Sequence, residues 1–124
     1  MTTVLIVDDE ALAAEETAEA LELAGLSTQW SADPFDAIAR AENPAVGVVV
    51  TDLRMPGLDG ARLIDRLRAS RTDLCFVIVT GHGTIDQGPA DPPEILARLR
   101  KPLDLVALID LLRLHLAESR DHAE

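Results

Sequence analysis

The stretch Val48-Val49-Val50-Thr51-Asp52-Leu53-Arg54-Met55-Pro56-Gly57-Leu58-Asp59-Gly60 decides the fold of this chain. Its first part is a run of β-branched apolar residues, which is typical of a strand buried on both faces of a parallel sheet. The Met-Pro-Gly that follows continues neither a strand nor a helix, so the chain must turn there. Asp52 therefore stands at the carboxyl end of a central strand, where open α/β sheets bind their ligands.

Length and composition indicate one folded domain. The chain has 124 residues, of which 48% are apolar, and 22 acidic against 11 basic residues give a net charge of −11. A chain of this length builds a single hydrophobic core. We therefore expect one domain over residues 1–124, with its core at about 3–118, a polar tail at 119–124 and no output domain.

The same composition bounds the partners and the compartment. An acidic chain without a basic face argues against direct contact with nucleic acid. No apolar run approaches the length of a membrane span, and no basic region precedes the apolar residues at the amino terminus. A single cysteine, Cys75, fits a reducing compartment. These features predict a cytoplasmic protein that has no membrane partner.

Strand and helix patterns alternate regularly along the chain. Apolar runs predict strands near 4–7, 26–31, 47–51, 75–79 and 95–100, and helical patterns cover 11–24, 34–41, 61–67 and 105–116. The segment 84–93 holds one glycine and three prolines, and each interior proline costs a helix about 3 kcal/mol. We expect an α/β fold with a parallel sheet, helices on both faces and an irregular or shortened fourth helix.

Right-handed crossovers place the carboxyl ends of all these strands at one edge of the sheet. That edge gathers Asp8, Asp9, Asp52, Thr80 and Lys101. Clustered carboxylates repel one another, and Mg²⁺, or Mn²⁺ in its place, relieves the repulsion with oxygen ligands. A carboxylate can also attack phosphorus and form an aspartyl phosphate. A metal ion, an ammonium and a hydroxyl around it form a sufficient set for phosphoryl transfer.

These motifs, in this order, resemble the receiver domains of two-component response regulators, including stand-alone chemotaxis-type regulators. The resemblance rests on Asp8-Asp9, on Asp52 within Thr-Asp-Leu-Arg-Met-Pro-Gly-Leu-Asp-Gly, on Thr80-Gly and on Lys101-Pro102, and it covers essentially the whole chain. It implies a flavodoxin-like, doubly wound five-stranded parallel sheet with strand order 2-1-3-4-5. It also implies a phosphoprotein that receives its phosphoryl group from a histidine kinase or a histidine phosphotransfer protein. Such a protein signals by phosphorylation-dependent binding of a downstream protein or by phosphorelay.

The resemblance also assigns metal ligands. Asp52 would be the phosphoacceptor, Asp9 a direct ligand of the metal, and Asp8 would act largely through water. The backbone carbonyl of Arg54 would complete the protein's share of the ligands. Arg54 and His82 are candidates for tuning dephosphorylation, and a solvent-facing loop histidine is an equal alternative for His82.

Further residues of the pattern concern the transferred group and its readout. Thr80 and Lys101 would contact the phosphoryl group, and the peptide bond between Lys101 and Pro102 is usually cis in the family. Arg98 stands where receivers usually carry Tyr or Phe, whose rotation reports phosphorylation to the output face. We therefore expect intact phosphorylation chemistry and an altered readout.

Two other functions fit parts of the pattern. One is a magnesium-dependent phosphohydrolase that works through an aspartyl phosphate. Haloacid-dehalogenase-type phosphatases need an Asp-x-Asp pair on the first strand, and Asp8-Asp9-Glu10 lacks that spacing. The other is an inactive receiver-like interaction module, which the complete acceptor set argues against. We therefore expect a protein that catalyses only its own phosphorylation and dephosphorylation.

The two aspartates after the first strand could also have a structural role. Asp8 or Asp9 could serve as the N-cap of the first helix.

Overall fold

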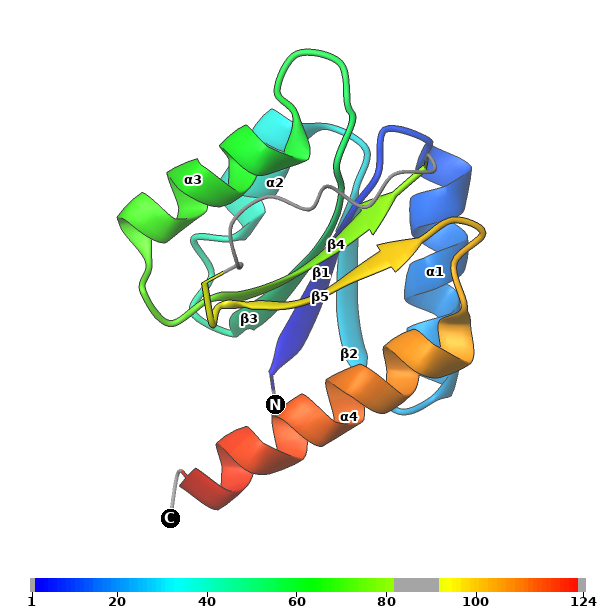
Figure 1. Cartoon of the computed structure of the whole chain (residues 1–124), viewed down its shortest axis with the longest axis vertical. Coiled ribbons are helices and arrows are strands. Elements are labelled where there is room, and N and C mark those ends of the chain that lie inside the picture. Colours follow the sequence, from blue (N-terminus) through cyan, green and yellow to red (C-terminus); the bar gives the residue numbers. More distant parts are fainter. Residues whose placement is uncertain (1, 82–91, 123–124) are drawn as a thin grey trace.

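The computed structural model describes residues 2–81 and 92–122, which form one parallel sheet between two layers of helices (Figure 1). The strands are β1 (Thr3–Val7), β2 (Ser27–Ser31), β3 (Val46–Asp52), β4 (Cys75–Thr80) and β5 (Ile95–Arg100). The helices are α1 (Ala11–Leu23), α2 (Pro34–Arg40), α3 (Gly60–Ser70) and α4 (Leu105–His122). The strand order is β2-β1-β3-β4-β5 and every pairing is parallel, so the predicted fold and topology are confirmed.

The central strand β3 holds the two layers together. Its valines at 48, 49 and 50 are at most 2% exposed, as the β-branched run predicted. Val49 packs on the side of α2 and α3 with Leu63, whereas Val48 and Val50 pack on the side of α1 and α4 with Leu108. Figure 1 shows these two helix pairs on opposite sides of the sheet. Alternate residues of one strand therefore supply both hydrophobic cores.

Most element boundaries follow the local sequence. Helix α2 begins as predicted, because the Asp33 carboxylate accepts a hydrogen bond of 2.9 Å from the backbone N–H of Phe35 and Pro34 takes the first helical position. Helix α4 continues to His122, past the expected end near residue 116 and into the expected polar tail. The helix thus extends beyond the apolar stripe that ends at Leu116.

Helix α1 begins at Ala11 as predicted, but its N-cap differs from the two candidates. Its N-cap is Glu10, which makes no capping hydrogen bond, so neither Asp8 nor Asp9 caps this helix. Instead, Oδ1 of Asp8 accepts a hydrogen bond of 3.0 Å from the backbone N–H of Glu10. Asp8 lies two residues before the N-cap and therefore cannot reach the free N–H groups of the first helical turn. The hydrogen bond holds the turn between β1 and α1.

The predicted irregular fourth helix falls largely on residues 82–91, which lie outside the described residues. The described end of that segment, Pro92 to Glu94, forms a turn in which the N–H of Ile95 donates to the carbonyl of Pro92 at 3.0 Å. Within 2–81 and 92–122, no helix is both long and apolar enough to cross a membrane.

Candidate functional site

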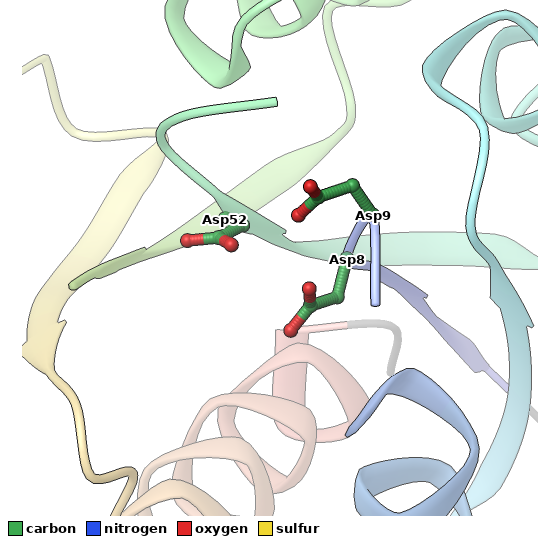
Figure 2. A group of neighbouring side chains, drawn as sticks. All are labelled: Asp8, Asp9 and Asp52. Atoms are coloured by element: carbon green, nitrogen blue, oxygen red, sulfur yellow. The ribbon is translucent and has the colours of Figure 1, made fainter. Parts of the chain in front are cut away.

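The carboxyl ends of β1 and β3 bring three carboxylates together. Asp8 and Asp9 follow β1, and Asp52 is the last residue of β3, one position beyond the pairing of Val7 with Thr51. Figure 2 shows the three side chains side by side at this edge of the sheet. One oxygen from each lies within 4.8 Å of the others, so the predicted grouping of these carboxylates is found in the structure.

Lys101 reaches the same cluster from the end of β5. Its Nζ lies 3.0 Å from Oδ2 of Asp52 and 3.6 Å from Oδ2 of Asp8. The backbone holds the lysine in register, because its N–H donates to the carbonyl of Thr80 at 2.8 Å. The peptide bond between Lys101 and Pro102 is cis. One ammonium therefore lies between two of the three carboxylates.

Burial and like charge set the electrostatics of Asp52. Desolvation raises the pKa of its carboxyl above the usual range, and the charges of Asp8 and Asp9 raise it further. The hydrogen bond and the charge of Lys101 act in the opposite direction without cancelling these effects. Burial alone would lower the pKa of the Lys101 ammonium, but its contacts with Asp52 and Asp8 raise that pKa overall. The cluster thus keeps an excess of negative charge.

The three carboxylates differ in their hydrogen-bond and ion-pair partners. Both oxygens of Asp8 are engaged, one by the Glu10 N–H and the other by Lys101. Asp52 accepts hydrogen bonds from the backbone N–H of Leu53 at 3.1 Å and from Lys101. Asp9 is exposed, and within the described part of the chain its carboxylate has no hydrogen-bond partner. Asp9 is therefore the member most available to a cation.

Thr80 is a second unsatisfied group at this edge. The residue is only 8% exposed, and its Oγ1 is buried without a hydrogen-bond partner among the described residues. Buried hydroxyl groups normally have a partner. Within 2–81 and 92–122, the hydroxyl at the end of β4 is thus a donor without an acceptor.

A cavity of about 210 Å³ opens beside these groups. Asp8, Asp52 and Lys101 line its polar part together with Glu10 and Thr17, and strand residues such as Val50 and Val79 line its apolar part. A space of this volume accommodates several water molecules. Asp9 and Thr80 lie outside its lining.

The remaining predicted residues lie around the cluster. Arg54 is exposed in the loop after β3, and the N–H of Leu53 just before it donates to the carbonyl of Val79 at 3.0 Å. Arg98 is a half-buried residue of β5 that pairs with Ile78 of β4. His82 lies outside the described residues.

Two contacts to the backbone of Asp52 were missed by the sequence analysis. The Thr51 hydroxyl donates to the Asp52 carbonyl, and Gly60 at the start of α3 packs against the same carbonyl. The glycine that ends the 48–60 stretch was a usable signal, because a glycine at a helix start can mark a close approach of backbone.

Comparison with known proteins establishes the family. The sequence model of the response regulator receiver domain matches residues 4–113. The chain belongs to the response regulator receiver domain family. It is accordingly a two-component signalling module with an acidic metal-binding type of site, not a conventional enzyme. Receiver domains are phosphorylated by histidine kinases, and the carboxylate triad is typical of the Mg²⁺ site of such domains.

Curated receiver-containing proteins are similar over most of this chain. The C4-dicarboxylate transport transcriptional regulatory protein DctD of Pseudomonas aeruginosa is 35% identical over 121 residues, covering 90% of this chain and 24% of that protein. The response regulator receiver protein Anae109_2439 of Anaeromyxobacter sp. is 34% identical over 112 residues, covering 90% of this chain and 47% of that protein. The chain thus spans less than half the length of either relative.

Solved receiver structures match the fold. The receiver domain protein from Clostridium thermocellum superposes with a TM-score of 0.84 at 22% identity, covering 97% of this chain and 98% of that one. The response regulator receiver protein from Pseudomonas putida gives a TM-score of 0.79 at 27% identity, covering 90% and 95% respectively.

Proposed function

We propose that this receiver accepts a phosphoryl group on Asp52 from a histidine kinase or a histidine phosphotransfer protein. It then signals by phosphorylation-dependent binding of a downstream protein or passes the group on in a phosphorelay. The functional unit proposed is residues 1–124, with the core at about 3–118. The observation that carries the proposal is the contact of Lys101 with Asp52 inside the carboxylate triad.

Each group around Asp52 has a part in this transfer. The Asp52 carboxylate attacks the phosphorus, so a P–O bond forms while the P–N bond to the donor imidazole breaks. The Lys101 ammonium balances the charge of the incoming phosphoryl oxygens through a charge-assisted hydrogen bond. The Thr80 hydroxyl, which lacks a partner within the described residues, donates to another of those oxygens. Transfer of this kind needs mainly positioning and charge neutralisation.

The donor set fits Mg²⁺, or Mn²⁺ in its place. Asp9, Asp52 and the backbone carbonyl of Arg54 would hold the ion directly, and Asp8 would hold it largely through water. All are hard oxygen donors, which Mg²⁺ prefers as ligands. The excess negative charge of the cluster attracts a divalent cation to these oxygens. When bound, the ion neutralises charge on the transferred phosphoryl group.

Phosphorylation with a small donor tests the proposal. Incubation with acetyl phosphate and Mg²⁺ should add one phosphoryl group, seen by intact mass spectrometry, and Asp52→Asn should abolish it. The matched control is Asp59→Asn in the same sequence stretch, since Asp59 is an exposed N-cap of α3 and asparagine also caps helices well. The control should be phosphorylated like the wild type. Labelling that persists in Asp52→Asn would refute the assignment.

Two further measurements complete the test. Turnover of a chromogenic phosphate ester would instead support the phosphohydrolase alternative. A phosphotransfer profile against the histidine kinases of the source organism identifies the donor, because the cognate kinase should transfer fastest.

A further inference from the structure

The peptide group that joins Asp52 to Leu53 is held from both sides. On its carbonyl side, Oγ1 of Thr51 donates to the Asp52 carbonyl at 3.0 Å in a fully buried hydrogen bond. On its N–H side, Leu53 donates to the carbonyl of Val79 at 3.0 Å and to Oδ1 of Asp52 at 3.1 Å. The backbone that carries the acceptor carboxylate is thus fixed where β3 ends.

Gly60 closes the carbonyl side of this peptide group. A Cβ at this position would overlap the carbonyl oxygen of Asp52 and would lie 3.2 Å from its carbonyl carbon and 3.0 Å from Cα of Leu53. The N–H of Gly60 also donates to the carbonyl of Leu53 at 2.8 Å. Among the described residues only Gly25 and Gly57 have a positive φ, so space and not backbone conformation accounts for glycine at position 60.

We propose that Gly60 and Thr51 are positioning residues for phosphoryl transfer to Asp52. Gly60 lets the start of α3 lie against the Asp52 carbonyl, and the Thr51 hydroxyl holds that carbonyl from within the sheet. Together they set the direction in which the Asp52 carboxylate leaves the strand and the course of the loop that follows. The inference rests on the function proposed above for Asp52.

The overlap made by an added methyl group at position 60 cannot be relieved by rotating a side chain. The three nearest atoms that the methyl group would meet belong to the backbone of Asp52 or Leu53, which cannot rotate away as a side chain can. Helix α3 is anchored in the core by buried residues, namely Leu63, Ile64 and Leu67. The displacement therefore falls on the end of β3, and small displacements of a reacting group cost large factors in rate.

The strand that carries Asp52 offers a matched control. Gly47 lies near the opposite end of β3, and a Cβ there would meet Cγ2 of Thr2 at 2.6 Å. That atom is the far end of a side chain, which can rotate away. Gly60→Ala and Gly47→Ala therefore make the same chemical change, one at the start of α3 and one on β3, and only the first would contact the backbone of Asp52.

The experiment measures the rate of phosphorylation at increasing acetyl phosphate with Mg²⁺ at saturation. Gly60→Ala should lower the rate constant at saturating donor by about 10- to 100-fold and leave the half-saturating donor concentration largely unchanged. Gly47→Ala should stay within about twofold of the wild type. A Gly60→Ala protein that is folded by amide hydrogen exchange and phosphorylated at the wild-type rate would overturn the role of Gly60.

Thr51 supplies a second test that does not depend on the folding of Gly60→Ala. Thr51→Val keeps the side-chain shape and removes the hydroxyl, and should slow phosphorylation about fivefold. Thr51→Ser restores the hydroxyl and should restore the rate, which a purely structural role of the residue would not require. Equal rates in the two variants would refute the role of Thr51. Failure of the wild type itself to be phosphorylated would instead refute the proposed function.

Discussion

The ammonium of Lys101 lies 3.0 Å from Oδ2 of Asp52, although 49 positions separate the two residues in the sequence. The contact reaches across the sheet, because β4 lies between the strands that carry them. A phosphoryl group on Asp52 would therefore meet a cation that is already in place. Lys101 would exchange a carboxylate oxygen for a phosphoryl oxygen, which makes it the natural link between phosphorylation and the end of β5.

Lys101→Ala is expected to leave the fold intact and to uncouple phosphorylation from conformational change. Lys101 is partly exposed, so its loss costs little packing, whereas the phosphoryl group loses its direct ammonium contact. NMR spectra with and without beryllofluoride measure the coupling. Arg100→Ala, which removes the neighbouring exposed cation at the end of β5, is the control and should keep the full response. A complete set of wild-type shifts in Lys101→Ala would contradict the role of the lysine.

Asp52→Asn is expected to stabilise the protein in the absence of divalent cations. The pKa of Asp52 is raised in the folded state, so the native protein binds this proton more readily than the unfolded chain, and ionisation at neutral pH opposes folding. Lys101 keeps Asp8 as a partner in the variant. We therefore expect the free energy of unfolding at pH 7 to be higher in Asp52→Asn than in the wild type.

The stabilisation expected for Asp52→Asn should depend on pH. As the pH falls through the folded-state pKa of Asp52, the wild-type carboxyl takes up its proton and the advantage of the asparagine disappears. Urea denaturation from pH 7 down to pH 4 without divalent cations measures the difference. A variant less stable than the wild type at pH 7, or a gain that does not change with pH, would contradict the argument.

The fold could be predicted because its signals are local and repeated. The valine run of β3 and the helical pattern over 34–41 each stand in a short window of sequence, and strand and helix patterns alternate regularly along the chain. The topology then placed Asp52 and Lys101 at one edge, since parallel strands end together. The location of the carboxylate cluster followed from the same rule.

Contacts made by the backbone could not be predicted in this way. The overlap that a side chain at position 60 would make with the Asp52 carbonyl depends on how closely α3 approaches β3, which no residue pattern states. The hydrogen bond from the Glu10 N–H to Asp8, in place of a helix cap, depends on the course of the turn between β1 and α1. Both features are set by the course of loops.

Arg71→Ala is expected to destabilise the fold by about 1–3 kcal/mol without changing phosphorylation. The Arg71 guanidinium donates to the carbonyls of Ala41 and Asn43 at 2.9 and 3.1 Å, and it makes a bidentate pair with Asp73. Its side chain is 16% exposed, so the two carbonyls would lose a largely buried donor.

Arg40→Ala is the matched control for this variant. Arg40 forms an ion pair with Asp36, and the two side chains are 43% and 47% exposed. Exposed ion pairs contribute about 0–1 kcal/mol to the free energy of unfolding. Urea denaturation compares the two variants, and the acetyl phosphate assay compares their phosphorylation rates. Equal stability losses in both variants would show that the buried contacts of Arg71 contribute nothing beyond its charge.

Asp9→Ala is expected to weaken Mg²⁺ binding more than Asp8→Ala does. The oxygens of Asp8 are engaged by the Glu10 N–H and by Lys101, whereas Asp9 has no hydrogen-bond partner within the described residues. A cation therefore meets less competition at Asp9. NMR titration of each variant with Mg²⁺ gives the affinities. Unchanged affinity in Asp9→Ala would contradict the assignment of this residue as the direct ligand.

The last prediction concerns how phosphorylation is read out. In receivers an aromatic side chain three residues before the lysine usually turns inward after the threonine moves, and here Arg98 takes that position on β5. Moving a guanidinium from its present surroundings into an apolar interior costs several kcal/mol of desolvation. We therefore expect the response to be confined mainly to the loops after β3 and β4, while the backbone around Arg98 changes little.

Amide hydrogen exchange with and without beryllofluoride tests this prediction. Exchange should change at residues 53–59 and directly after Thr80, and it should change little across 95–100. Arg98→Tyr restores an aromatic ring and should extend the response into β5, whereas Arg100→Tyr, at an exposed position two residues later, should not. The same data report whether residues 84–93 form a regular helix, which the prolines argue against. A wild-type response that reaches β5 as strongly as it reaches the two loops would show that Arg98 transmits the signal after all.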